Sequence, residues 1–298
     1  KNVMTEEVRD SFPQKYLESI CEENGHIYSV PFQMDIMMFW VNQELLKQAG
    51  LDEIKNTGDF DILQKSLKNP DQYAYGDAWE NTHVYNSLSQ FVNFWGGDYF
   101  DWTDPKTKDA ARYMKSMLDE KNTSPAQFVD QYEQMEEKFI RGKYGCVFMY
   151  TSALGTFLDA DVYGKNKIHM APLPVLHKKK ATNIATWQYV LNNASENKDA
   201  AVRFLQYAAG YEGSTEYAKI MKSYPARVDV IENEDIDLEG IDMIRKYLRE
   251  YTLNARPLCE NSMGAVSDMG KLFQGYVLGQ CEEDSFFEQA QNCINTYY

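Results

Sequence analysis

Side chains that commonly carry catalysis are present in this chain, but none of them falls in a known catalytic motif. The four histidines, His26, His83, His169 and His177, lie outside any HExxH pattern and beside no evident nucleophile. The glycine patterns of nucleophile elbows, phosphate loops and dinucleotide sites do not occur in the sequence. The chain has 45 acidic residues, so a carboxylate pair for glycoside hydrolysis stays open as an alternative. Nothing marks one pair above another, and the sequence therefore favours binding over catalysis.

Gln33 and Asp35 form a polar pair directly before an apolar run at residues 36–41. Polar groups at the start of a buried strand must be solvated, hydrogen-bonded or bound to a ligand. A carboxylate can accept hydrogen bonds from two hydroxyls, whereas a purely structural Asp35 would cap or pair locally. Farther along, Trp187 and Gln188 combine a flat ring with an amide, and Trp187 is either a stacking platform or packing. These residue types suit a ligand with apolar ring faces and a rim of hydroxyls, such as a sugar.

The elements that position these residues alternate between strands and helices. Residues 27–31 are predicted to be extended, and 36–41 to be a strand buried on both faces, followed by a short helix that Asn42 caps and Gly50 ends. Further strands are predicted near 73–79, 146–150, 167–174 and 185–193, and helices near 84–95, 105–118, 125–141, 197–210, 214–222, 241–252, 264–278 and 284–297. This order predicts an α/β protein with parallel strand pairs.

Composition limits the class of protein further. A chain of 298 residues is expected to form two lobes, because one domain usually takes roughly 150 residues. Aromatic residues make up 14% of the chain, which suits a surface that stacks against flat rings. The formal charge of −15 disfavours nucleic acid and anionic lipid as partners. The five cysteines are too scattered for a zinc site or a disulfide framework, and no signal peptide or transmembrane run is visible.

Residues 25–51 carry a resemblance to a known family. The pattern G-x-I-Y-x-V-P at 25–31, a polar crossover, an apolar strand and N-x-x-L-L-x-x-A-G-L at 42–51 resembles the extracellular solute-binding proteins of carbohydrate ABC importers, of the maltose-binding type. The resemblance implies a two-lobed, class II periplasmic-binding-protein-like α/β fold. By analogy, the first lobe comprises 1–34 and 188–240, and the second comprises 36–183 and 241–298. Relatives have a further stretch before this pattern, so we expect the first lobe to be incomplete and the chain to be a piece of a longer protein.

The resemblance also implies a function. The protein is expected to bind a mono- or oligosaccharide between its lobes and to deliver it to the permease subunits of an ABC transporter, with no reaction, cofactor or metal. It is expected to be a monomer outside the cytoplasmic membrane, as a cell-surface lipoprotein or in the periplasm, and not to bind nucleic acid. A polyamine or peptide is an alternative solute, and a carbohydrate-active hydrolase is the alternative from another class.

Positions in the resembled family that line the ligand cleft can be transferred to this chain. They fall on the two crossover segments, on the loop after the strand at 146–150, and on segments near 227 and 260. The entry to the helix near 84 is added, because the N-terminus of that helix presents free N–H groups toward the cleft. The residues implied are Gln33, Asp35, Trp79, His83, Tyr85, Asn86, Tyr150, Ser152, Trp187, Gln188, Arg227, Glu260 and Asn261. For Trp79 and Tyr85 the alternative is packing under the loop, and for Arg227 it is a salt bridge that braces its own loop.

Overall fold

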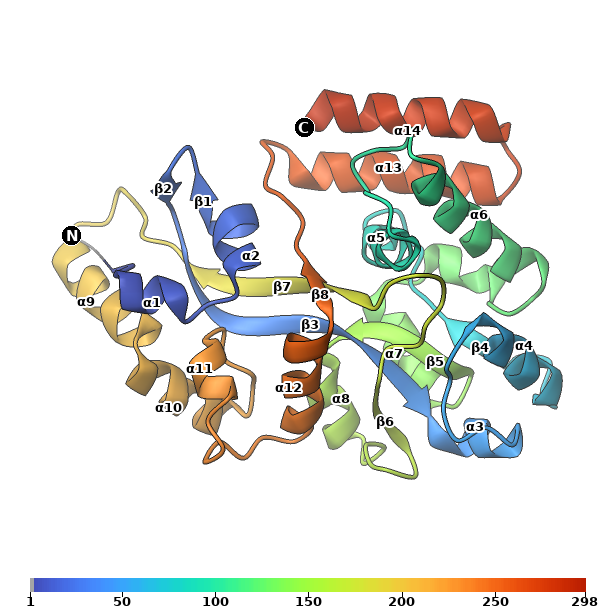
Figure 1. Cartoon of the computed structure of the whole chain (residues 1–298), viewed down its shortest axis with the longest axis horizontal. Helices are drawn as coiled ribbons and strands as arrows, with labels where there is room; N and C mark the ends of the chain where they lie inside the picture. The colour runs from blue at the N-terminus through green and yellow to red at the C-terminus, as the bar shows by residue number, and fades with distance from the viewer. Residues whose placement is uncertain (1–2) are drawn as a thin grey trace. The chain divides into compact units, whose positions relative to one another are not determined.

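The computed structural model describes residues 3–298, which fold into two compact units (Figure 1). The first unit holds the described residues up to Ile36 together with Asn183–Leu258, and the second holds Met37–Thr182 and Cys259–Tyr298. The chain passes from one unit to the other within strand β3 (Val30–Asn42), within strand β7 (Ala181–Tyr189) and after Leu258. Each unit is therefore assembled from segments that are far apart in sequence.

The boundary after Leu258 differs from the expected one, which placed residues 241–258 in the second lobe. Helix α12 (Ile241–Glu250) stays with the first unit, because the Arg245 guanidinium donates to the carbonyl oxygens of Ile231 and Asn233, both at 2.8 Å. The acidic stretch at 231–240 is thus a connection inside this unit. Composition alone cannot distinguish such a turn from a linker between lobes.

The first unit is built on the paired ends of β3 and β7. Val30 pairs with Tyr189, and Asp35 pairs with Ala185, in antiparallel register with an irregularity after Pro31. The Tyr16 hydroxyl donates to the Ala185 carbonyl at 2.9 Å and ties the N-terminal helices to this ladder. The other elements of the unit are α1 (Glu6–Asp10), α2 (Gln14–Tyr16), the π-helical turn η1 (Leu17–Cys21), β1 (Glu22–Glu23), β2 (His26–Ile27), α9 (Lys198–Ala209), α10 (Tyr211–Met221), α11 (Val228–Ile231) and β8 (Thr252–Asn254).

The second unit is built on a mixed sheet with helices packed against it. Strand β3 pairs in antiparallel fashion with β5 (Tyr144–Tyr150) and β6 (Ile168–Ala171), whereas β4 (Tyr73–Gly76) and β5 are parallel. Parallel pairing was expected, and it holds for β4 and β5 but not for the pairs that β3 makes. The helices are α3 (Gln43–Gln48), α4 (Thr57–Ser66), α5 (Val84–Trp95), α6 (Pro105–Asp119), the 3₁₀ helix η2 (Pro125–Val129), α7 (Tyr132–Ile140), α8 (Ala153–Asp159), α13 (Ser262–Val277) and α14 (Glu283–Tyr297). Helices α13 and α14 lie side by side (Figure 1).

The apolar run at 36–41 is confirmed as strand, buried on both faces. Met37 and Met38 point to opposite sides of the sheet, and neither has any exposed surface. The Trp40 indole donates to the Met149 carbonyl at 2.9 Å, so its polar edge is satisfied within the core. The Asn42 side chain accepts from the first backbone amides of α3, as the sequence predicts for a helix cap.

The predicted helix over 125–141 is instead two elements. Helix η2 ends at Val129 and α7 begins at Tyr132, with an extended connection between them. The backbone amide of Trp79 donates to the Gln127 carbonyl at 2.8 Å, and that of Glu80 donates to the Asp130 carbonyl at 3.2 Å. Carbonyl groups that bond sideways to another segment are taken out of the helical ladder, so the helix breaks here.

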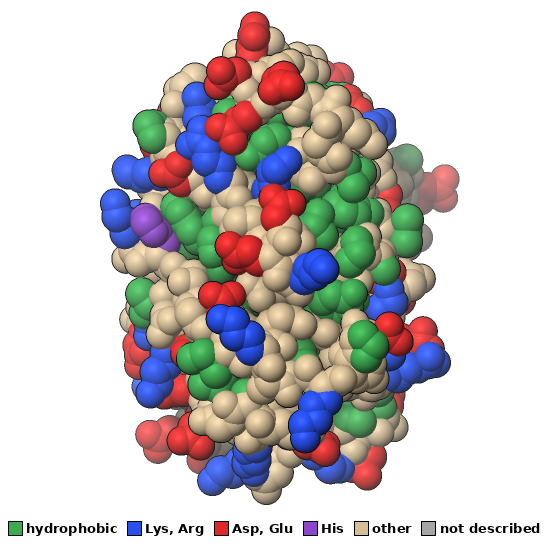
Figure 2. Space-filling view, turned by 90° about the vertical axis from the view of Figure 1, so that its right-hand side faces the viewer, with side chains coloured by type: hydrophobic (Ala, Val, Ile, Leu, Met, Phe, Trp, Pro, Cys, Tyr) green, Lys and Arg blue, Asp and Glu red, His purple; other side chains and the backbone are tan. Residues whose placement is uncertain are grey.

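The surface carries both signs of charge. On the face drawn in Figure 2, acidic and basic side chains are interspersed, with apolar side chains between them. Among residues 3–298, the helices are all too short or too polar to span a lipid bilayer.

Candidate functional site

Three of the predicted ligand-contacting residues share one face of the β3–β7 pair. Gln33 stands opposite Trp187, and Asp35 stands opposite Ala185. Opposite residues of an antiparallel pair, and residues two apart on one strand, point to the same side of a sheet. The side chains of Gln33, Asp35 and Trp187 therefore lie on one side, although Trp187 is distant from the other two in sequence.

Helix α10 brings a fourth side chain, Tyr217, to this face. Its hydroxyl donates to Oε1 of Gln33 at 2.6 Å, and its ring meets Phe32 edge-on with 5.6 Å between ring centroids. Burial raises the pKa of Tyr217, and the negative charge of Asp35 adds to that effect. We call Gln33, Asp35, Trp187 and Tyr217 the strand-face group.

Exposure differs strongly within the strand-face group. Asp35 keeps only 6% of its surface exposed, whereas Trp187 keeps 61%. Gln33 and Tyr217 are half-buried between these extremes. A recessed carboxylate is a strong hydrogen-bond acceptor in a site that holds little water, and an exposed indole offers a flat apolar surface. The group thus combines the two kinds of contact that a hydroxylated ring requires.

Gln188, which was predicted to contact a ligand beside Trp187, lies outside this group. It follows Trp187 directly, so strand alternation turns its side chain to the other face of β7. There its Oε1 accepts from the Ser29 hydroxyl, and the Cys21 thiol lies 3.7 Å from the same oxygen. The side chain is engaged in packing β7 against the segment before β3.

A second cluster of predicted residues lies in the second unit, around the start of α5. The Tyr150 hydroxyl, at the end of β5, donates to Oδ1 of Asn86 at 3.3 Å. The Tyr132 ring meets Tyr150 edge-on at 6.4 Å and His83 edge-on at 5.4 Å between centroids. Nδ1 of His83 lies 3.0 Å from Oε2 of Glu80. We call Glu80, His83, Asn86, Tyr132 and Tyr150 the loop–helix group.

Glu80 is the charged member of the loop–helix group. Burial by itself would raise the pKa of Glu80, but hydrogen bonds from Thr82 and His83 outweigh it, and the pKa is lowered. The backbone amide of Thr82 donates to Oε2 of Glu80 at 2.9 Å, and the Thr82 hydroxyl donates to the same oxygen. The loop before α5 therefore folds around the Glu80 carboxylate, next to the aromatic rings and the Asn86 amide of this group.

Tyr132 and Glu80 belong to this group but were not predicted. With a single helix over 125–141, Tyr132 falls on the same apolar face as Met135 and Phe139 and reads as core. The break before α7 places Tyr132 in the first turn of a separate helix instead, against His83 and Tyr150. The helix breaks at Asp130, whose backbone carbonyl accepts from the Glu80 amide. The sequence does not show that Glu80 lies beside Asp130, so the break could not be recognised from it.

Two of the predicted residues, Trp79 and Tyr85, are part of the core. Trp79 has no exposed surface and lies edge-on between Phe128 and Phe273, at 5.5 and 5.4 Å between centroids. Tyr85 is 9% exposed and packs edge-on against Tyr99 at 4.8 Å. Packing under the loop, the alternative noted for both, describes their places in this structure.

Three further predicted residues stand at helix starts. Ser152 is exposed at the N-cap position of α8, and Asn261 is at that of α13. Oδ1 of Asn261 accepts from the Gly264 backbone amide at 3.0 Å, so this side chain caps its own helix. Glu260 precedes it and is exposed.

Arg227 is a brace within the first unit. The side chain is 1% exposed, and its guanidinium donates to the Ala209 carbonyl at 2.9 Å and to Asp229 at 3.0 and 2.7 Å. The Nη2 atom that donates to Asp229 at 2.7 Å also donates to Glu7 at 3.0 Å, which ties α11 to α1. These contacts with protein groups match the bracing salt bridge that was the alternative for Arg227.

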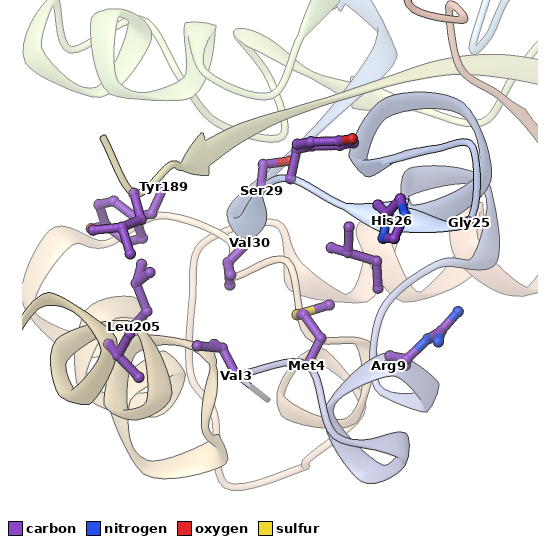
Figure 3. Close-up of a pocket in the computed structure, with 13 residues that line it drawn as sticks. Val3, Met4, Arg9, Gly25, His26, Ser29, Val30, Tyr189 and Leu205 are labelled. Carbon is purple, nitrogen blue, oxygen red and sulfur yellow. The ribbon is translucent and has the colours of Figure 1, made fainter. Parts of the chain in front are cut away.

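A hollow of about 620 Å³ lies in the first unit but contains none of the predicted ligand residues. Figure 3 shows Val3, Met4, Val30, Tyr189 and Leu205 around it. The lining also includes the polar side chains of His26, Tyr28 and Ser29, and the Arg9 guanidinium is paired with Glu22 at 3.3 Å. Gln33, Asp35, Trp187 and Tyr217 do not line this hollow.

Comparison with known proteins identifies the class to which this arrangement belongs. The sequence model of the bacterial extracellular solute-binding proteins matches residues 3–215, and the chain belongs to that family. A probable amino-acid ABC transporter periplasmic-binding protein, y4oP of Sinorhizobium fredii, is 24% identical over 239 residues, which are 76% of this chain and 54% of that protein. The arabinooligosaccharide-binding protein of Bacillus subtilis is 23% identical over 248 residues, 78% of this chain and 56% of that one. The chain thus spans about half the length of these relatives.

Solved structures establish the fold. A solute-binding protein from Thermotoga lettingae bound with alpha-D-tagatose superimposes with a TM-score of 0.83 at 16% identity, covering 99% of this chain and 78% of that one. Maltose-bound MalE3 of T. maritima gives a TM-score of 0.80 at 17% identity, covering 96% and 76%. The α/β fold of class II periplasmic binding proteins, expected from the sequence, is confirmed.

Proposed function

We propose that this protein is the extracellular substrate-binding component of an ABC importer and that it binds a mono- or oligosaccharide. The strand-face group carries the proposal, since it sets a recessed carboxylate beside an exposed indole in a member of a solute-binding family. Similar proteins named for arabinooligosaccharides, tagatose and maltose support a sugar as the solute. The protein holds the sugar outside the cytoplasmic membrane, transfers it to a permease and catalyses no reaction on it.

Within this function, Asp35 accepts hydrogen bonds from sugar hydroxyls and Trp187 stacks on an apolar ring face. The loop–helix group has matching chemistry, with an amide in Asn86 and rings in Tyr132 and Tyr150, and is a second candidate contact surface. Sugar hydroxyls are already hydrogen-bonded in water, so a site must replace those bonds with oriented groups. Both groups supply such orientation, because polar side chains in each are fixed by a neighbour.

A thermal-shift screen of the full-length protein against maltose, arabinooligosaccharides, D-tagatose, D-mannitol, peptides and polyamines tests this proposal. A saccharide that binds should raise the unfolding temperature in a concentration-dependent way. Calorimetry with the best saccharide should then show saturable heat and no product. Release of a hydrolysis product, or a response to a peptide or polyamine alone, would overturn the assignment.

Substitutions test the site itself. Asp35→Ala and Trp187→Ala should each weaken saccharide binding by about 1–3 kcal/mol, from losing a buried acceptor or a stacked ring. Asp35→Asn keeps the shape and removes the charge, which separates a binding loss from a folding defect. Tyr28→Ala is the matched control, because Tyr28 is another ring of the first unit and is 62% exposed. Unchanged affinity in both Asp35→Ala and Trp187→Ala would remove the strand-face group from the site.

A further inference from the structure

Tyr217 is the one member of the strand-face group that comes from a helix. Its hydroxyl reaches Oε1 of Gln33 at 2.6 Å, a short and well-formed hydrogen bond. The Tyr217 ring is itself held, because it packs edge-on against Phe32 at 5.6 Å and Phe32 stacks on Tyr189 at 4.2 Å between centroids. Phe32 lies at the irregularity between Pro31 and Gln33, which brings two successive residues of β3 against one tyrosine. Gln33 is therefore fixed by a ring that has little freedom of its own.

The hydrogen bond from Tyr217 determines which end of the Gln33 amide already has a partner. A carboxamide has an oxygen that accepts and an NH₂ group that donates, on opposite corners of one plane. With Tyr217 bonded to the oxygen, the NH₂ group points the other way. Gln33 is half-buried and stands opposite Trp187, which is 61% exposed. The donor corner of the amide thus belongs to the same face as the exposed indole.

Two residues along the same strand, Asp35 presents the opposite polarity. A carboxylate accepts hydrogen bonds, and it follows Gln33 on the same side of β3. The Tyr217 hydroxyl is protonated at neutral pH and able to donate, and burial, with a smaller contribution from the Asp35 charge, raises the pKa of Tyr217 further above its ordinary value of 10.0. The face therefore offers a donor at Gln33 and an acceptor at Asp35, in fixed order.

We propose that Tyr217 is a positioning residue that holds the Gln33 amide with its NH₂ group toward the sugar, so that the site selects for an acceptor oxygen next to a donating hydroxyl. The inference rests on the proposed function. It defines the substrate class more narrowly, as saccharides with an oxygen that accepts a hydrogen bond next to a free hydroxyl that donates one. A saccharide that lacks the accepting oxygen leaves the Gln33 donor unpaired and should bind less tightly.

The test measures binding of the tightest saccharide from a panel of maltose, arabinobiose and D-tagatose by the full-length protein. Tyr217→Phe should weaken binding about five- to tenfold, the scale of one hydrogen bond. Gln33→Glu keeps an acceptor for Tyr217 but has no NH₂ group, and it should weaken binding at least as much. Tyr28→Phe, which removes a hydroxyl from an exposed ring of the same unit, should leave affinity unchanged.

A double-variant comparison separates positioning from general stabilisation. In a Gln33→Ala background, Tyr217→Phe should have no further effect on affinity, because no amide is left to orient. With the monodeoxy analogue that lacks the accepting oxygen, Tyr217→Phe should again change nothing. Equal losses in both backgrounds would mean that Tyr217 acts only through folding, and the inference would be overturned.

The remaining outcomes distinguish a failure of this inference from a failure of the proposed function. If the unsubstituted protein binds a saccharide and Tyr217→Phe or Gln33→Glu leaves the affinity unchanged, this inference alone is overturned. No binding of any saccharide by the unsubstituted protein, in a folded state shown by a cooperative thermal transition, overturns the proposed function and this inference with it.

Discussion

Asp77 is a buried carboxylic acid that holds the end of β4 to the start of α5. It has no exposed surface, accepts from the Tyr75 hydroxyl at 2.6 Å and from the Ala78 amide at 2.8 Å, and also accepts from the Ser87 hydroxyl. Burial raises the pKa of Asp77, and the hydrogen bonds offset only part of that rise. The loop that carries Glu80 and His83 starts three residues later, so this carboxyl group anchors the loop–helix group from below the surface.

The raised pKa predicts how stability depends on pH. Between its ordinary pKa near 3.8 and its raised value, Asp77 holds a proton in the folded state that the unfolded state has released. Its contribution to the free energy of unfolding is therefore greatest below about 3.8 and declines as pH rises through the raised pKa. Asp77→Asn removes this titration, so the variant should gain stability relative to the unsubstituted protein as pH increases. Urea unfolding at a series of pH values measures the difference.

Asp101 provides the matched control for that experiment. It is a partly exposed carboxylate whose pKa is lowered by hydrogen bonds from the hydroxyl and backbone amide of Thr103. The stability it contributes is present above its ordinary pKa and is lost as pH falls through the lowered one. Asp101→Asn should therefore show the opposite trend from Asp77→Asn. The same trend in both variants would contradict the assignment of the effect to Asp77.

At the scale of single residues, the sequence could predict on which face of a strand each side chain lies, because strand geometry controls it. The alternation of side chains along β3 places Gln33 and Asp35 on one face, and the same rule should have removed Gln188 from the neighbours of Trp187. Arg227 could not be assigned in this way. Its partners Glu7 and Ala209 come from other helices, and only the folded arrangement brings them to the guanidinium.

Among the elements, helix starts were predicted where one side chain decides them. Asn42 caps α3 by accepting from backbone amides of its first turn, as predicted, and α6 begins at residue 105, where the predicted helix begins. The break between η2 and α7 was not predicted, because it depends on hydrogen bonds to residues 79 and 80 rather than on local propensity. Tyr132 entered the loop–helix group through that break. The same tertiary contact thus hid both an element boundary and a site residue.

The packing of α13 on the loop before α5 is close enough to test with one methyl group. A Cβ at Gly270 would lie 2.0 Å from the Asn81 carbonyl oxygen. The loop cannot easily move away, because the Asn81 amide donates to Ser267 at 2.8 Å and the Gln274 amide donates to the Trp79 carbonyl at 2.5 Å. Gly270→Ala should therefore destabilise the fold by about 1–3 kcal/mol, measured by thermal or urea unfolding.

Gly275→Ala, on the same helix, is the control for Gly270→Ala. The nearest atom to a Cβ at Gly275 is the end of the Gln280 side chain, 4.0 Å away. Replacing a helical glycine by alanine without a clash should be neutral or stabilising by up to about 1 kcal/mol. Similar destabilisation by both substitutions would show that helix α13, rather than its contact with the loop, is the sensitive feature.

The whole molecule is assembled from interrupted segments, and this feature was partly visible in the sequence. Length predicted two units, and the polar crossover at 33–35 lies next to the boundary at Ile36. The position of the last boundary was not visible, because α12 is held in the first unit by hydrogen bonds from Arg245 to the carbonyls of Ile231 and Asn233. A discontinuous unit is defined by such interactions rather than by composition, since no linker-like sequence need mark its edges.

The net charge of the molecule separates the proposed solute from its main alternative. A formal charge of −15 attracts cations over the Debye length, which is about 10 Å at 0.1 M salt and about 3 Å at 1 M. A saccharide is neutral, so its dissociation constant should change less than about twofold between roughly 0.05 and 0.5 M NaCl. A polyamine carries several positive charges and should bind about tenfold or more less tightly at the higher salt concentration. Calorimetric titrations of maltose, arabinobiose and spermidine at one pH and both salt concentrations measure these dissociation constants. The assignment would be reversed if spermidine bound more tightly than any saccharide at low salt and its affinity fell steeply at high salt.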